Sequence, residues 1–115
     1  MNLPDLRILR FLLALLAVAF LFAAPLRADG DGAGLFKTKC AMCHGPDGKG
    51  EVPMGKKLGA RDLTSAEVQK QSDAELTEVV TKGKNKNKMP PYEGKLSKEQ
   101  IAQLVAYIRE IAKKH

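Results

Sequence analysis

Aromatic residues and cysteines are scarce in this chain of 115 residues, which contains no tryptophan, two tyrosines, four phenylalanines and two cysteines. A small domain with so few aromatic side chains buries only a thin apolar core. A zinc site needs four ligands, but there is no third cysteine, and one of the two histidines is the last residue, His115. The composition therefore argues against a zinc site and leaves the cysteines for another chemistry.

The two cysteines belong to the sequence Cys40-Ala41-Met42-Cys43-His44. Two cysteines separated by two residues and followed by a histidine are the signature of covalent attachment of a c-type haem. Each thiol adds to one haem vinyl group, and the adjoining imidazole can then bind the iron. A thioredoxin-like redox pair is the alternative, but it belongs to a βαβ context that this sequence does not predict. We therefore expect haem c with its iron, attached at Cys40 and Cys43 and bound by His44.

The first 28 residues have the organisation of a secretory signal peptide. Arginines precede an apolar block of 14 residues, 11–24, and small residues follow it. An uncleaved membrane anchor is the alternative, but 14 helical residues cover about 21 Å, less than the ~30 Å hydrocarbon core of a bilayer. We predict a signal peptide over 1–28, cleavage after Ala28, export to the periplasm, and one haem-binding domain over 29–115.

The exported domain is mildly basic. The whole chain has a formal net charge of +6, and removal of the signal peptide takes away three arginines and one aspartate, which leaves +4. There is no arginine-rich stripe with interleaved aromatic residues, so we expect no nucleic-acid binding. The charge instead favours an acidic protein partner or peripheral contact with an anionic membrane surface.

The domain is predicted to be all-α, because no segment alternates for long with the period of a strand. A helix is expected over 33–39, whereas 45–61, which is rich in turn-forming residues, is expected to be a loop. Capping boxes predict three further helix starts. They pair Thr64 with Glu67 for a helix to about Lys70, Ser72 with Glu75 for a helix that ends at Gly83, and Ser97 with Gln100 for a helix over 98–113. The apolar residues that share one face of this last helix are Ile101, Leu104, Val105, Ile108 and Ile111.

Met89 is the candidate for the second axial ligand of the iron. It lies in a polar, lysine-rich loop directly before two prolines, which hold the backbone extended and so present the sulfur. A thioether ligand raises the reduction potential relative to a second imidazole. Met1 leaves with the signal peptide, Met42 lies inside the attachment motif, and Met54 follows that motif too closely to reach the opposite face of the haem. The alternative for any methionine is that it fills the core.

The chain resembles a small monohaem class I c-type cytochrome of the exported bacterial type. The resemblance covers essentially residues 31–112. The segments that carry it are Cys40-Ala41-Met42-Cys43-His44-Gly45, Met89-Pro90-Pro91-Tyr92, and the helix from Ser97 to Ile111 with its Ala106-Tyr107-Ile108-Arg109. It implies the class I cytochrome c fold, in which N- and C-terminal helices cross and short helices and loops surround one haem. Gly34 and Phe36 fit the first of these helices, which crosses the second near Tyr107.

The resemblance also implies roles for individual residues. Cys40 and Cys43 would form the thioethers, and His44 and Met89 would be the two axial ligands of the iron. Pro53 lies where the family often has a proline whose carbonyl accepts a hydrogen bond from the iron-bound imidazole. Arg61 and the lysines are candidates for contacts with the haem propionates, although solvated surface charges are the alternative for each.

Three functions are compatible with such a haem. The first is a periplasmic electron carrier, which is a monomer, is not an enzyme and passes single electrons between redox protein partners. The second is a dedicated cytochrome subunit of a larger redox enzyme complex. The third is a gas-binding haem sensor from which the methionine ligand dissociates, but two prolines after Met89 argue against it. The lysines of the loop, Lys82, Lys84, Lys86 and Lys88, either steer an acidic docking surface to the haem edge or only keep the loop soluble.

Overall fold

The computed structural model describes residues 5–22 and 31–115. Helix α1 (Leu6–Phe22) contains most of the predicted apolar block, and its side chains from Leu6 to Leu16 are exposed. Within the described ranges, no helix combines the length and the apolar character needed to cross a bilayer. The predicted cleavage position after Ala28 lies outside the described residues.

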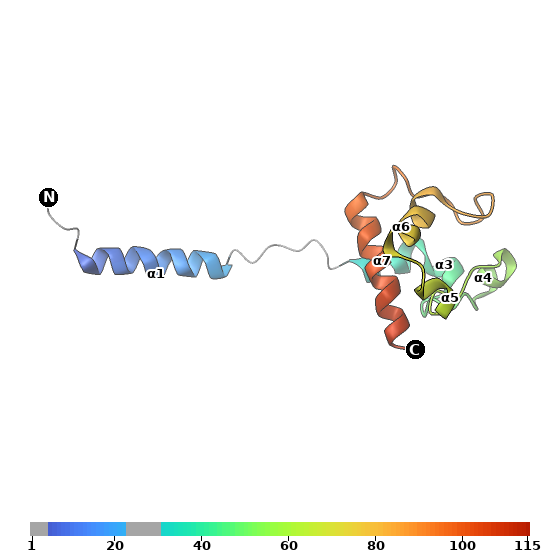
Figure 1. The fold of residues 1–115 in the computed structure, drawn as a ribbon, viewed down its shortest axis with the longest axis horizontal. Helices are drawn as coiled ribbons and strands as arrows, with labels where there is room; N and C mark the ends of the chain where they lie inside the picture. The colour runs from blue at the N-terminus through green and yellow to red at the C-terminus, as the bar shows by residue number, and fades with distance from the viewer. Residues whose placement is uncertain (1–4, 23–30) are drawn as a thin grey trace.

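Residues 31–115 fold into six helices joined by turns, with the long α7 at the C-terminal end (Figure 1). The helices are α2 (Gly32–Lys39), α3 (Ala41–His44), α4 (Pro53–Leu58), α5 (Ala66–Gln69), α6 (Asp73–Lys82) and α7 (Lys98–Lys113). Apart from two isolated bridges, which pair Lys84 with Met89 and Glu93 with Leu96, the described part of the chain has no β-structure. The prediction of an all-α domain is confirmed.

Helices α2 and α7 cross in close contact, and α6 also packs against α7. Gly32 lies at the crossing, where an added Cβ would be 2.6 Å from the carbonyl oxygen of Gln103. Phe36 is 1% exposed, and the centroid of its ring lies 5.2 Å from that of Tyr107. The predicted contact of Phe36 near Tyr107 is confirmed, but a Cβ on Gly34 would meet only a side chain of its own segment. Gly32 is therefore the glycine that the crossing requires.

Ten buried apolar side chains form one core around α7. They are Phe36, Val68, Leu76, Val80, Leu96, Ile101, Leu104, Val105, Ile108 and Ile111. Half of them lie on α7, and these are the residues of the predicted apolar face. At ~1.5–3 kcal/mol for each large side chain, their burial supplies much of the stability of so small a domain.

The two longest helices of this domain begin at the predicted capping boxes. The hydroxyl of Ser72 accepts a hydrogen bond from the backbone N–H of Glu75, whose carboxylate accepts one from the N–H of Ser72. Ser97 and Gln100 make the same reciprocal pair at the start of α7. Each pair satisfies two backbone donors that would otherwise have no partner at the start of a helix.

Two expectations between residues 45 and 70 are wrong. The segment 45–61 is not loop throughout, because Pro53 opens the short helix α4, which ends at the left-handed Gly59. The capping residue of α5 is Ser65, whose hydroxyl accepts from the N–H of Val68. Thr64 does not cap a helix, since its hydroxyl donates to the carboxylate of Asp62 at 2.6 Å.

Candidate functional site: a cavity between two walls

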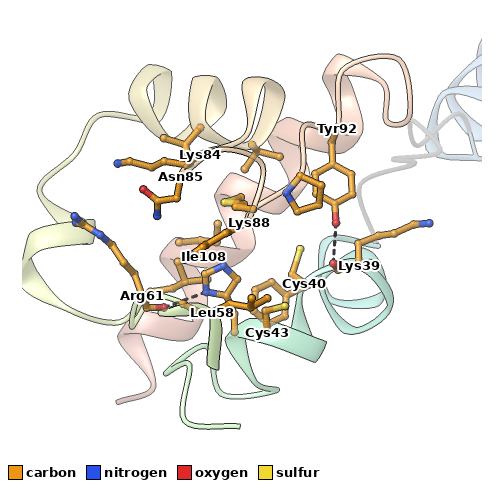
Figure 2. A pocket seen from close by; sticks show the side chains of 18 of the residues that line it. Lys39, Cys40, Cys43, Leu58, Arg61, Lys84, Asn85, Lys88, Tyr92 and Ile108 are labelled. Carbon is orange, nitrogen blue, oxygen red and sulfur yellow. Dashed lines mark hydrogen bonds between the residues drawn. The ribbon is translucent and has the colours of Figure 1, made fainter. Parts of the chain in front are cut away.

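A largely apolar cavity of about 310 Å³ lies beside the core. Two groups of lining residues form its walls (Figure 2). The attachment wall comprises residues 36–44 and 58–63, and the methionine wall comprises residues 76–92. Val68 and Ile108 contribute side chains from the core. The cavity volume is within the range of pockets that hold small molecules and cofactors in proteins.

The predicted attachment residues lie together on the attachment wall. Cys40, Cys43 and His44 all line the cavity, and the backbone N–H groups of Cys43 and His44 donate to the carbonyl of Cys40 in the turn of α3. Both cysteines are half-buried and neither forms a disulfide. Burial, with a further contribution from Cys43, raises the pKa of Cys40 to about 11, so this group is a protonated thiol at neutral pH.

The orientation of the His44 imidazole is set by a backbone carbonyl. Its Nδ1 atom lies 3.0 Å from the carbonyl oxygen of Arg61, so a proton on Nδ1 would be donated there and the lone pair of Nε2 left for a metal. Burial lowers the pKa of His44, although the hydrogen bond opposes this shift, which favours the neutral ring. The prediction that the carbonyl of Pro53 accepts this hydrogen bond is wrong. Pro53 is instead the exposed first residue of α4.

Close backbone contacts support the attachment wall from behind. A Cβ on Gly55 would overlap the carbonyl oxygen of Cys43 and lie 2.5 Å from that of Gly50. Gly50 has a φ of 72°, and a Cβ there would lie 2.7 Å from the carbonyl oxygen of Ala60. Because real Cβ atoms do not approach backbone so closely, only glycine fits either position. These contacts fix the segment that carries Arg61 against the segment that carries His44.

The methionine wall presents Met89 from a short hairpin. The N–H of Lys84 donates to the carbonyl of Met89 at 3.0 Å, and the N–H of Met89 donates back at 3.2 Å. Between them Asn85, Lys86 and Asn87 have φ values of 54°, 55° and 65°, a left-handed conformation that asparagine tolerates better than lysine does. Met89 is half-buried and lines the cavity together with the attachment residues.

The other described methionines lie differently. Met42 is 75% exposed and belongs to the attachment segment itself, although it also borders the cavity. Met54 is 39% exposed and does not line the cavity. Of these three methionines, Met89 is therefore the one that lines the cavity from outside the attachment segment.

Comparisons with known proteins agree on one family. The model of the family "Cytochrome C oxidase, cbb3-type, subunit III" matches residues 27–108. Cytochrome c6 of Nostoc sp. is 39% identical over 103 residues, which cover 85% of this chain and 88% of that protein. Cytochrome c6 of Microcystis aeruginosa is 37% identical over 84 residues, which cover 73% of this chain and 98% of that protein. The solved structure of the KustC0563 c-type cytochrome matches with a TM-score of 0.63 and 36% identity, over 70% of this chain and 96% of that one.

The chain belongs to the class I c-type cytochromes. It has the all-α class I cytochrome c fold, as predicted, and its cofactor is covalently bound haem c with iron. It is an electron-transfer cytochrome, and its partners are redox proteins. The cavity fits this cofactor, because two thiols, an imidazole and a thioether border one space whose remaining walls are mainly apolar.

Cationic side chains surround the cavity of this cytochrome. Lys39, Arg61, Lys84 and Lys88 line it, and among the described residues no carboxylate does. Lys82, which the sequence placed in the same group as Lys84 and Lys88, instead pairs with Glu93, with 2.9 Å between the ammonium nitrogen and a carboxylate oxygen. The field at the cavity is therefore positive, which favours an anionic group of the cofactor or an acidic partner.

Arg109 holds the end of α5 and the segment that follows it against α7 of the cytochrome. Its guanidinium donates to the carbonyl of Gln69 at 2.9 Å and also to the carbonyl of Gln71. The Gln69 side chain in turn donates to the carbonyl of Leu63 at 2.7 Å. The N–H of Leu63 donates to the carbonyl of Gly48 at 2.8 Å, so the chain of hydrogen bonds reaches the loop after the attachment motif. No local sequence pattern marks this brace, because its acceptors are main-chain carbonyls.

Proposed function

We propose that this cytochrome is a periplasmic carrier of single electrons whose haem is attached at Cys40 and Cys43 and has His44 and Met89 as its axial ligands. The observation that carries the proposal is that Met89, from the methionine wall, borders the same cavity as the attachment residues. Cytochrome c6 relatives of similar length support a small carrier. The bound haem supplies the one-electron chemistry, in which iron cycles between Fe(II) and Fe(III).

The residues of the chain hold this centre in one geometry. The carbonyl of Arg61 orients the imidazole of His44, and the hairpin from Lys84 to Met89 presents the sulfur. Apolar side chains of both walls exclude water, which reduces the rearrangement that accompanies a change of charge at the centre. With both axial positions filled by protein, no site for a substrate is left open, so we propose that the protein is not an enzyme.

The positive edge of the cavity supports an acidic docking surface on the partner. Lys84 and Lys88 lie on the methionine wall, and Lys39 lies beside Cys40 on the attachment wall (Figure 2). Opposite charges on a partner would speed encounter and orient it toward the haem edge. Arg61 also lines the cavity, and its guanidinium lies 3.9 Å from the carboxylate of the exposed Glu67, a pair that contributes little to stability. Arg61 is therefore the candidate that we propose for contact with a haem propionate.

The proposed location rests on the N-terminal sequence. The apolar block of 14 residues after the arginines is typical of a signal peptide, and α1 contains most of it. Covalent haem attachment is compatible with export, which brings both reduced thiols to the periplasm. We therefore propose a cleaved signal peptide over 1–28 and a monomeric periplasmic domain that contacts a membrane surface only peripherally. Osmotic-shock fractionation and N-terminal sequencing of the haem protein test both statements.

A second candidate is a dedicated cytochrome subunit of a larger redox complex. It is favoured by the matching family model, which is described as a subunit of cbb3-type cytochrome c oxidase. The two candidates differ in how the native protein purifies. A carrier is recovered in the periplasmic fraction and elutes as a monomer in size-exclusion chromatography. A subunit is recovered in the membrane fraction and elutes at the size of a complex.

Carbon monoxide tests the proposed ligation. We expect the spectrum of the reduced, haem-loaded protein to stay unchanged under carbon monoxide, because Met89 occupies the sixth position. Met89→Ala should bind the gas promptly and have a lower reduction potential. Met54→Ala is the matched control, since Met54 lies outside the cavity, and it should behave as the wild type. Prompt binding by the wild type would contradict the proposal and favour the gas-binding sensor.

A further inference from the structure

The segment that contains Met89 is held to its own wall by main-chain hydrogen bonds. Besides the hairpin bonds with Lys84, the N–H of Tyr92 donates to the carbonyl of Val80 at 3.1 Å, and the N–H of Glu93 donates to that of Thr81 at 3.1 Å. These bonds join the segment to α6 and to the start of its own hairpin. They do not determine how far the methionine wall stands from the attachment wall.

The side chain of Tyr92 connects the two walls. Its hydroxyl group donates to the carbonyl oxygen of Lys39 at 2.9 Å, between residues 53 positions apart in the sequence. Lys39 is the last residue of α2, and Cys40 follows it directly. Figure 2 shows this hydrogen bond beside Cys40, at one edge of the cavity. The tie therefore ends on the attachment segment itself.

The environment of Tyr92 keeps this tie in place. The side chain is half-buried and packs against the core cluster. Burial raises the pKa of the Tyr92 phenol, so the hydroxyl is a donor at all physiological pH values. A neutral hydrogen bond of this kind shifts the equilibrium between a closed and an open loop by roughly fivefold. This is a small part of the stability of the whole fold but a large effect on the opening of one loop.

The two residues between Tyr92 and Met89 are prolines, whose φ angles are fixed by their rings. The backbone between Tyr92 and Met89 is therefore less able to absorb a displacement of Tyr92. On the other side of Met89, the left-handed residues Asn85, Lys86 and Asn87 form an exposed loop. Tyr92 is thus the fixed end of the segment, and the hairpin tip is its free end.

We propose that Tyr92 is a positioning residue that, by donating to the carbonyl of Lys39, closes the methionine wall on the attachment wall and keeps Met89 on the iron. This inference rests on the proposed ligation by His44 and Met89. The tie does not contact the haem iron, and it controls how often the methionine segment opens. Opening exposes the sixth position to an added ligand, so its frequency can be measured.

The test compares Tyr92→Phe with Tyr107→Phe in the haem-loaded protein. Both changes remove one hydroxyl from a half-buried ring, but Tyr107 packs on Phe36 through its ring, and among the described residues no hydrogen bond of its hydroxyl is found. Imidazole is titrated into the oxidised protein, where it must displace Met89 in order to bind. We expect Tyr92→Phe to bind imidazole about fivefold more tightly than the wild type and Tyr107→Phe to match the wild type.

Thermal unfolding separates positioning from general stabilisation. If both variants stay folded in thermal unfolding and only Tyr92→Phe gains affinity for imidazole, the positioning role is supported. If Tyr92→Phe loses stability while its imidazole affinity equals that of the wild type, the role is only structural and the inference is wrong. If the wild type already binds carbon monoxide as fast as Met89→Ala, Met89 is not a ligand of the iron, and both the proposed ligation and this inference are wrong. If the wild type does not bind carbon monoxide and Tyr92→Phe binds imidazole no more tightly than the wild type, this inference is wrong but the proposed ligation stands.

Discussion

The two walls of the cavity are built on different principles. The attachment wall is held from behind by contacts between backbones, with Gly50 and Gly55 at positions where no side chain fits. The methionine wall consists of the end of α6 and the local hairpin that follows it, with a row of exposed residues at the hairpin tip. The attachment wall cannot move without displacing other main chain, whereas the hairpin of the methionine wall can open at the cost of a few hydrogen bonds.

This difference fits the two ligands that the walls are proposed to supply. Thioether bonds and an imidazole define where the haem sits, so a rigid support is useful there. A methionine sulfur binds iron more weakly, and its supply from a separate wall makes ligation depend on the closed state of the loop. Variants on the two walls should therefore have different consequences, which the following predictions order by size.

The largest effect is expected from Gly55→Ala, behind the attachment wall. In a solvent-exposed helix this change would stabilise by about 1 kcal/mol, but here the new Cβ overlaps the carbonyl of Cys43. We expect a loss of at least ~3 kcal/mol in the free energy of unfolding, measured by denaturant titration of the haem protein. Gly59→Ala is the control, since it has a φ of 69° but no atom within 4 Å of the added Cβ. It should lose only about 1–2 kcal/mol, and an equal loss in both variants would contradict the close-packing argument.

An intermediate effect is expected from Arg109→Lys in the brace behind the attachment wall. Lysine keeps the charge but cannot reach the carbonyls of Gln69 and Gln71 with one rigid fork, so part-buried acceptors lose their donors. We expect a loss of about 2 kcal/mol in unfolding free energy. Asp73→Asn tests the exposed ion pair of the same guanidinium, at 3.0 Å, and should lose less than about 1 kcal/mol. A larger loss for Asp73→Asn would mean that the ion pair, not the carbonyl contacts, carries the brace.

The smallest effect, and one of opposite sign, is expected from Lys86→Gly at the tip of the methionine wall. Lys86 has a φ of 55°, and glycine adopts this conformation without strain. We expect a gain of about 0.5–1 kcal/mol in unfolding free energy, reduced somewhat by the greater freedom of glycine in the unfolded chain. Lys88→Gly, at a position with ordinary φ, should lose stability in the same denaturant titration. A loss in both variants would show that the left-handed run is not strained.

Local patterns in the sequence predicted much of this cytochrome. The attachment motif places Cys40 and His44 within one turn, and the capping boxes at Ser72 and Ser97 define the starts of the two longest helices of the domain. The period of apolar residues on α7 identified five of the buried core residues. These features depend on neighbours within ten positions, which is why sequence reasoning finds them.

The missed features depend on contacts between distant segments or on the main chain. The six residues of α4 include Gly55 and have no apolar period, so the helix gives no local signal. Thr64 and Ser65 both carry a hydroxyl that could cap α5. The Thr64 hydroxyl donates to the carboxylate of Asp62, so Ser65 is the residue that caps the helix. The carbonyl of Arg61, which lies beside the His44 imidazole, has no side-chain signature, and the family resemblance points to the carbonyl of Pro53 instead. The tie from Tyr92 to Lys39 spans too many residues for any periodicity to mark it.

The contact of Gly32 with α7 also has a consequence for the order of folding. Gly32 meets Gln103, about 70 residues further along the chain, so the crossing of α2 and α7 closes a loop that contains nearly the whole domain. The entropy cost of such a closure must be met before its contacts can stabilise the chain, which slows folding relative to a bundle of sequential helices. During synthesis the core cannot be completed until α7 has emerged, and the cysteines are therefore accessible in an open chain before the fold encloses them.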